Sequence, residues 1–76
     1  MNKIEIIIYD SNFVLVDSFD LFDTMKEARA WVKEAGLDEK YWDRRAEVQG
    51  WARRNVHSIQ LWKNNEFIQD WFPEWK

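Results

Sequence analysis

The chain has 76 residues, which predicts a single domain over residues 1–76, near the lower size limit for a core that folds unaided. It has no cysteine, which excludes disulfides and thiolate metal sites and is typical of a reducing, cytoplasmic compartment. The net charge is −3, no apolar run approaches the roughly 20 residues of a membrane helix, and acids interrupt the N-terminal apolar stretch, so we expect no membrane contact and no signal peptide.

Residues 3–9 are rich in isoleucine, and β-branched side chains favour a strand. A polar triplet at 10–12 supplies turn chemistry, and an apolar run resumes at 13–16. The segment therefore predicts a hairpin with a two-residue loop that sets Tyr9 opposite Val14. Both faces of this hairpin are apolar, which favours a central position that is covered on both sides.

Residues 24–35 show the apolar spacing of a helix with one buried stripe. Thr24 and Glu27 have the spacing of a capping box at its beginning. Gly36 follows the last apolar position, where it predicts a left-handed stop.

Residues 37–55 allow two interpretations. Asp38 can cap a short helix over 38–44, with acids in its first turn. Residues 45–49 alternate polar and apolar side chains, as an edge strand does. We expect a helical turn near 38–44, followed by a strand or extended segment through residue 52.

The C-terminal part predicts a second hairpin. Residues 56–63 and 66–72 have strand composition, and Asn64-Asn65 between them suits a primed two-residue turn. That register sets Leu61 opposite Ile68. A proline then ends the last strand, because it cannot donate to the ladder.

Together these segments predict an α+β fold in the order ββα(α/β)ββ. A small antiparallel sheet of four strands, or five if residues 45–52 join it, is covered on one face by one helix.

The six tryptophans are more than a small core needs, so we expect some on the surface, where exposed aromatic side chains mark partner sites. In the predicted register Trp62 lies opposite Phe67, on the face away from Leu61. A single helix covers one face of a sheet, which leaves this aromatic pair open. Trp71 follows on the same alternation and Trp75 lies in the tail. These four are the predicted partner contacts.

The first third of the chain is acidic, and Asp17, Asp20 and Asp23 recur at every third position. The loop lacks the glycine and terminal glutamate of a calcium hand. One interpretation is a strand end, a polar loop and a helix cap. The other is an acidic surface that steers a partner or competes for its basic site, so these aspartates join the predicted contacts.

A Trp-x-Arg-Arg pattern occurs twice, nine residues apart, with the arginines at positions Arg44, Arg45, Arg53 and Arg54. Aromatic and basic side chains together bind single-stranded nucleic acid by stacking and phosphate contact. On one continuous helix this spacing would separate the two units, and packing of arginine stems on tryptophan is the simpler explanation. Nucleic acid is the alternative partner, disfavoured by the acidic net charge.

Catalysis has little support in the sequence. The only histidine, His57, stands beside Ser58 in a predicted strand, so the two side chains point to opposite faces. One histidine without cysteine excludes the common zinc and iron ligand sets, and no glycine-rich phosphate loop is present. We expect no enzyme activity, no metal and no cofactor.

Short, acidic, cysteine-free and aromatic-rich chains with a small sheet and one helix resemble accessory proteins of phages and mobile elements, including anti-CRISPR and other anti-defence inhibitors. This resemblance implies an inhibitor that blocks a host protein or nucleoprotein complex. It lies in overall style, and no residue role is carried over from it. We therefore expect a non-enzymatic protein-binding module, with a nucleic-acid-binding module and a structural homo-oligomer as alternatives.

Overall fold

The computed structural model describes residues 3–75, which form a four-stranded antiparallel sheet and two helices in the order ββααββ. The strands are β1 (Ile4–Tyr9), β2 (Leu15–Phe19), β3 (Ser58–Lys63) and β4 (Glu66–Trp71). The helices are α1 (Met25–Trp31), which continues into the π-helical turn η1 (Val32–Gly36), and α2 (Glu39–Gln49), with the short 3₁₀ turn η2 (Arg53–Asn55) after it. The predicted α+β class is confirmed.

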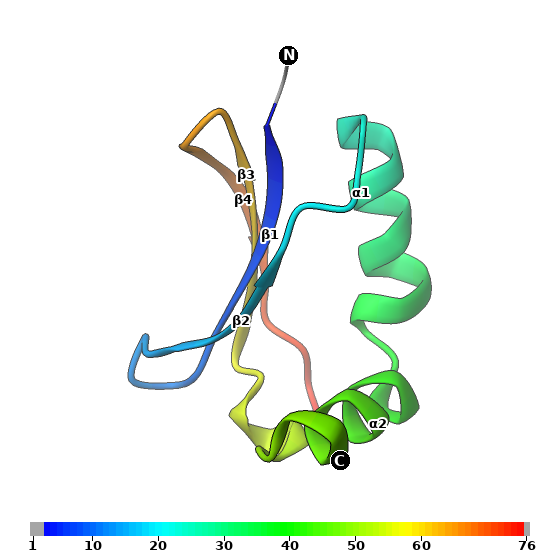
Figure 1. The fold of residues 1–76 in the computed structure, drawn as a ribbon, viewed down its shortest axis with the longest axis vertical. Helices are drawn as coiled ribbons and strands as arrows, with labels where there is room; N and C mark the ends of the chain where they lie inside the picture. The colour runs from blue at the N-terminus through cyan, green and yellow to red at the C-terminus, as the bar shows by residue number, and fades with distance from the viewer. Residues whose placement is uncertain (1–2, 76) are drawn as a thin grey trace.

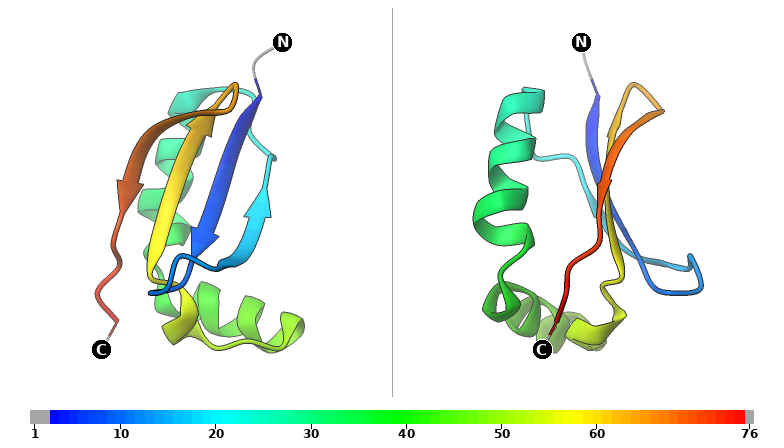
Figure 2. Two further views of the ribbon diagram at one scale, coloured as in Figure 1. Left: turned by 90° about the vertical axis from the view of Figure 1, so that its left-hand side faces the viewer. Right: turned by 180° about the vertical axis from the view of Figure 1, so that it is seen from behind.

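The sheet has the strand order β2-β1-β3-β4, so the two hairpins meet through β1 and β3. Both helices lie on the same side of the sheet, with α1 along it and α2 across one end (Figure 1). Turned by 90°, the molecule shows the four strands with α1 behind them and α2 below their lower end (left view of Figure 2). Within residues 3–75, no helix is long and apolar enough to cross a membrane.

The core lies between the sheet and the helices. Strand β1 turns Ile4, Ile6 and Ile8 toward the helices, and each of the three is at most 2% exposed. Strand β1 is central, as expected, but the prediction that the N-terminal hairpin is covered on both faces is wrong. Both helices pack on one face, and β2 is an edge strand.

The first helix begins as predicted, because the Thr24 hydroxyl accepts a hydrogen bond from the Glu27 N–H across 3.1 Å. The role predicted for Gly36 is wrong, since this residue stays within η1 and Gly50 is the glycine with a positive φ in residues 3–75. Gly36 instead makes room for an aromatic ring. A Cβ at this position would lie 3.1 Å from Cζ3 of Trp31.

Residues 39–49 form one continuous helix, so the strand or extended segment expected through residue 52 is wrong over its first half, and no fifth strand forms in the described part of the chain. The Asp38 carboxylate accepts from the Lys40 N–H across 3.0 Å and caps the helix. Trp42 and Ala46, four residues apart, are both buried, so helical periodicity prevails over the local alternation. Gly50, at φ 84°, ends the helix.

The first hairpin has a longer loop than predicted, and Tyr9 pairs with Leu15 instead of Val14. The cause is the Asp10 carboxylate, which accepts hydrogen bonds from the backbone N–H groups of Asn12 and Val14. These bonds draw residues 10–14 into a compact turn.

The second hairpin has the predicted turn, with Asn64 and Asn65 at φ values of 52° and 67°. Trp62 pairs with Phe67, as predicted. Leu61 pairs with Gln69 instead of Ile68, because a β-bulge shifts the register between Leu61 and Trp62. A bulge of this kind changes which side chains beyond it face the helices.

Candidate functional site

The candidate site is the sheet face that no described helix covers, called the open face below. Its side chains are Glu5, Ile7, Tyr9, Leu15, Ser18, Gln60, Trp62, Phe67 and Asp70. They alternate along the strands with the core residues, and all of them are exposed or half-buried, whereas the isoleucines on the other face of β1 are buried. Ser58, opposite Tyr9 at the edge of this face, is fully buried. The face lies toward the viewer in the left view of Figure 2.

An aromatic pair occupies one end of the open face, next to the β3–β4 turn. The rings of Trp62 and Phe67 meet edge to face, with centroids 5.8 Å apart. The indole N–H of Trp62 donates to the side-chain oxygen of Gln60 across 3.0 Å, which fixes the ring along its strand. Phe67 is 49% exposed. The pair thus lies on the face that the described helices leave uncovered, with Trp62 half-buried and Phe67 exposed.

A second apolar group lies at the other end, where β1 leads into β2. The rings of Tyr9 and Phe13 are 6.5 Å apart, and Leu15 pairs with Tyr9 across the strands. Phe13 and Leu15 are 64% and 58% exposed. The β1–β2 loop and the β3–β4 turn both bend away from the helices, so the two apolar groups flank the middle of the face (Figure 1).

Two carboxylates accompany these apolar groups. Glu5 pairs with Trp62 across the strands, and its carboxylate lies 3.6 Å from the Lys3 ammonium. Asp70 pairs with Gln60 and is half-buried. Its carboxylate has no hydrogen bond or ion pair with any residue in the range 3–75. The open face is thus apolar and aromatic, with acidic groups interspersed.

Trp71 does not belong to this surface, so the prediction that it shares a face with Trp62 and Phe67 is wrong. The bulge in β4 reverses the alternation, and Trp71 pairs with Ile59 and packs against the core. Gln69, two residues before Trp71 on the same face of β4, supports this placement. Gln69 accepts a hydrogen bond from Arg29 of α1 across 3.3 Å.

Trp75 is docked on the body of the protein and is not a free tail residue as predicted. Its indole N–H donates to the Val56 carbonyl across 2.8 Å, and the Arg53 guanidinium lies over its ring. The expected surplus of surface indoles is also wrong in the main. Trp42 is fully buried, and Trp31, Trp51, Trp71 and Trp75 are half-buried against the core. Trp62 lies on the open face and is half-buried as well.

The three aspartates of the acidic stretch do not form one surface. Asp17 lies on the helix side of β2, opposite Ile8, and its carboxylate pairs with the guanidinium of Arg45. Its hydrogen bond is the main cause that raises the pKa of Arg45 above the ordinary arginine value. Asp20 and Asp23 are exposed in the segment between β2 and α1. The predicted continuous acidic patch is reduced to these two.

The two Trp-x-Arg-Arg units serve the fold. Arg45 pairs with Asp17 and lies over the Phe19 ring, 5.1 Å from its centroid. Arg53 donates to Asp43 across 3.0 Å and to Glu39 across 3.4 Å.

The tryptophans of both units are turned inward, with Trp42 fully buried and Trp51 packed against the core. Arg44 and Arg54 are exposed. The stacking platform that single-stranded nucleic acid needs is therefore not assembled from these units.

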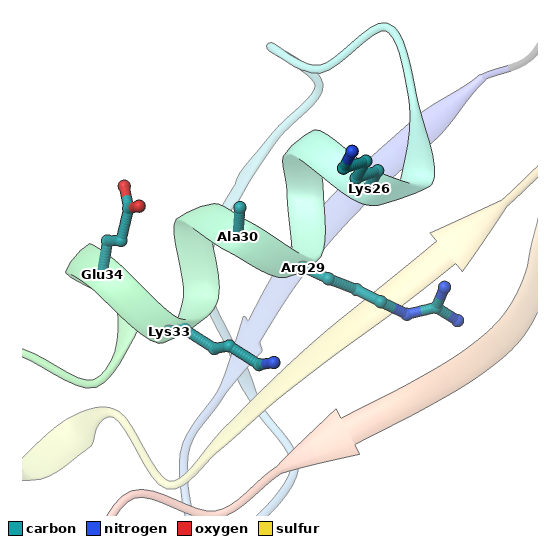
Figure 3. A pocket seen from close by; sticks show the side chains of 5 residues that line it. All are labelled: Lys26, Arg29, Ala30, Lys33 and Glu34. Carbon is teal, nitrogen blue, oxygen red and sulfur yellow. The ribbon is translucent and has the colours of Figure 1, made fainter.

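A shallow depression of about 430 Å³ lies on α1 and its extension, and Figure 3 shows its lining of Lys26, Arg29, Ala30, Lys33 and Glu34. All of these side chains come from one continuous helical segment, on the opposite side of the sheet from the open face. His57 is exposed and its ring contacts Phe72, while Ser58 is buried. Within residues 3–75, no group of three or more histidines or acids is placed to hold a metal ion.

No protein-family model, curated protein or solved structure matches this chain. The site therefore rests on geometry alone. Sequence reasoning found Trp62 and Phe67 but missed Ile7, Tyr9 and Leu15. The alternation of buried and half-buried residues along β1 would have placed Ile7 and Tyr9 on the open face. Leu15 was missed because the predicted register of the first hairpin was wrong.

Proposed function

We propose that this protein is a non-enzymatic module that binds another protein through the open face of its sheet. The observation that carries the proposal is the grouping of exposed and half-buried aromatic and aliphatic side chains on a face that no described helix covers, with half-buried Trp62 beside exposed Phe67. Exposed apolar groups on one surface mark interaction sites, and aromatic side chains dominate binding energies there.

The finer form of the proposal is an inhibitor that acts by occupying a surface of a host protein or nucleoprotein complex, as the resemblance to anti-defence proteins implies. Occupancy requires a rigid surface and no catalytic group. The open face meets the first requirement, because its four strands are bonded to one another and backed by a buried core. A rigid surface loses little conformational entropy on binding.

The ion pairs of Arg45 and Arg53 weigh against the nucleic-acid alternative. Both guanidiniums are already neutralised within the fold, so they release few counterions from a nucleic acid.

The test is affinity capture of a host protein with the wild-type chain and with the variants Trp62→Ala and Phe67→Ala. We expect each variant to remain folded by circular dichroism and to lose at least about tenfold in affinity for the captured protein. Val48→Ala is the matched control, because Val48 is 86% exposed on α2, away from the open face. Equal capture by all four proteins would contradict the proposal.

A further inference from the structure

Twice within this fold, an arginine lies between an aromatic ring and a carboxylate. The guanidinium of Arg45 lies 5.1 Å from the Phe19 ring centroid and pairs with Asp17. The guanidinium of Arg53 lies 5.8 Å from the Trp75 ring centroid and pairs with Asp43. In both cases the cation lies over the ring while an N–H group reaches the acid.

The open face also has an aromatic ring and nearby carboxylates, but it has no arginine from the described residues over that ring. Trp62 pairs with Glu5 on β1, and its indole N–H reaches Gln60, the cross-strand partner of Asp70 on β4. The indole thus lies between two strands that each carry an acid. Asp70 is opposite Gln60 and therefore diagonal to Trp62. Diagonal neighbours are about 7–8 Å apart, a span that a long side chain with its guanidinium on the indole can bridge.

No arginine of residues 3–75 lies over the Trp62 ring, and no cation in that range pairs with Asp70. Among the described residues, the Lys3 ammonium pairs with Glu5, and no ion pair reaches Asp70. A half-buried carboxylate beside an indole is a ready acceptor for a cation that comes from outside the chain.

We infer that the partner bound by the open face supplies an arginine, set in an apolar segment, that stacks on Trp62 and pairs with Asp70. The inference rests on the proposed function and adds the chemistry of the partner. Aliphatic or aromatic neighbours of that arginine would cover Phe67 at one end of the face and Tyr9 at the other. Lysine is a poorer substitute, because its ammonium neither stacks as a plane nor bonds in two places.

A second copy of the chain fits the open face less well than such a segment. Face-to-face packing would enclose Glu5 and Asp70 of both copies, and among the described residues Lys3 is the base that pairs with Glu5. Buried carboxylates without a cation are costly.

The probe is a library of random dodecapeptides displayed on phage and selected on the wild-type protein. Peptides that no longer bind Trp62→Ala or Phe67→Ala, with both variants shown to be folded by NMR, are the open-face binders. We expect most of them to contain an arginine flanked by apolar residues. Replacing that arginine with citrulline, which keeps the shape and removes the charge, should weaken binding to the wild type about tenfold.

The same replacement should cost less than about twofold on Asp70→Asn, because the charge it removes has no acceptor there. Asp23→Asn is the control, since Asp23 is exposed directly before the N-cap of α1, and it should behave as the wild type. Open-face binders without arginine, or an equal citrulline effect on Asp70→Asn, would overturn the inference and leave the proposed function standing.

If no selected peptide depends on Trp62 or Phe67, the proposed function itself fails, and the inference fails with it. A dimer in sedimentation equilibrium that Trp62→Ala dissociates would also overturn the inference, because it would assign the open face to a second copy.

Discussion

The indole N–H of Trp42 donates a hydrogen bond to the carbonyl oxygen of Gly36 across 2.6 Å, inside the core. This bond joins α2 to the end of η1. The Trp31 ring packs on the same glycine and meets the Trp42 ring edge to face, with centroids 6.1 Å apart. Two tryptophans therefore hold the helix layer that backs the open face.

We expect Trp42→Phe to destabilise the protein by about 2–4 kcal/mol, because it removes the donor to a buried carbonyl and leaves a small cavity. Urea denaturation measures the change. Trp62→Phe is the matched control, since the bond it removes goes to a side chain on the open face, and its cost should stay below about 1 kcal/mol. Similar costs for the two substitutions would contradict the assigned role of the Gly36 bond.

Trp71 and Trp62 should differ in their effect on stability. Trp71 packs against the core, whereas Trp62 contacts Phe67 on the open face. We expect Trp71→Ala to cost about 3 kcal/mol and Trp62→Ala about 1 kcal/mol in the free energy of unfolding. Thermal unfolding of both variants tests the bulge in β4, because without it the two residues would share a face and the order of the costs would not hold.

The Asp17–Arg45 pair links the β2 edge to α2 and should couple energetically. Both side chains are partly shielded, so we expect a coupling of about 1 kcal/mol in a double-mutant cycle with Asp17→Asn and Arg45→Met. A coupling near zero would show that Arg45 stabilises the fold only through its contact with Phe19.

The pH dependence of that pair follows from the raised pKa of Arg45. A basic group whose pKa is higher in the folded state contributes stability that is complete below its unfolded pKa and is lost only above it. We therefore expect the contribution of Arg45 to stay constant from about pH 6 to pH 10. Urea titrations of the wild type and Arg45→Met across this range measure the difference in their free energies of unfolding. A steady change of that difference with pH would refute the expectation.

Ser58 should be replaceable at no cost. Its side chain is fully buried and its hydroxyl has no hydrogen-bond partner within residues 3–75. A buried hydroxyl without a partner carries a desolvation cost, so we expect Ser58→Ala to be neutral or to stabilise by up to about 1 kcal/mol. Chemical denaturation measures the change. A loss greater than about 1 kcal/mol would mean that the hydroxyl is bonded.

Gly50 should be sensitive to substitution for a backbone reason alone. Its φ is 84°, and a Cβ there would meet no atom within 4 Å. We expect Gly50→Ala to cost about 1 kcal/mol, and Gly50→Asn less, because asparagine tolerates this conformation better than alanine. Thermal unfolding of the two variants compares them, and an alanine no worse than asparagine would contradict the left-handed end of α2.

Local chemistry in the sequence determined the second hairpin turn and the first helix cap. Asn64-Asn65 predicted its primed turn correctly, and Thr24 predicted its cap, because each depends on a few neighbouring backbone groups. The same reasoning placed Trp62 opposite Phe67, since the pairing lies two residues from a tight turn. Predictions of this kind succeed where the decisive interactions lie within one turn of chain.

Only the tertiary structure decided which aromatic side chains are covered. The bulge near Ile68 turns Trp71 toward the helices, and burial of Trp42 with Ala46 makes residues 45–49 helical despite their alternating pattern. In both places the free energy of the local preference is smaller than the free energy gained by burying apolar surface in the core. The packing of the whole core decides which apolar side chains stay uncovered on the open face. No short segment of sequence determines that packing.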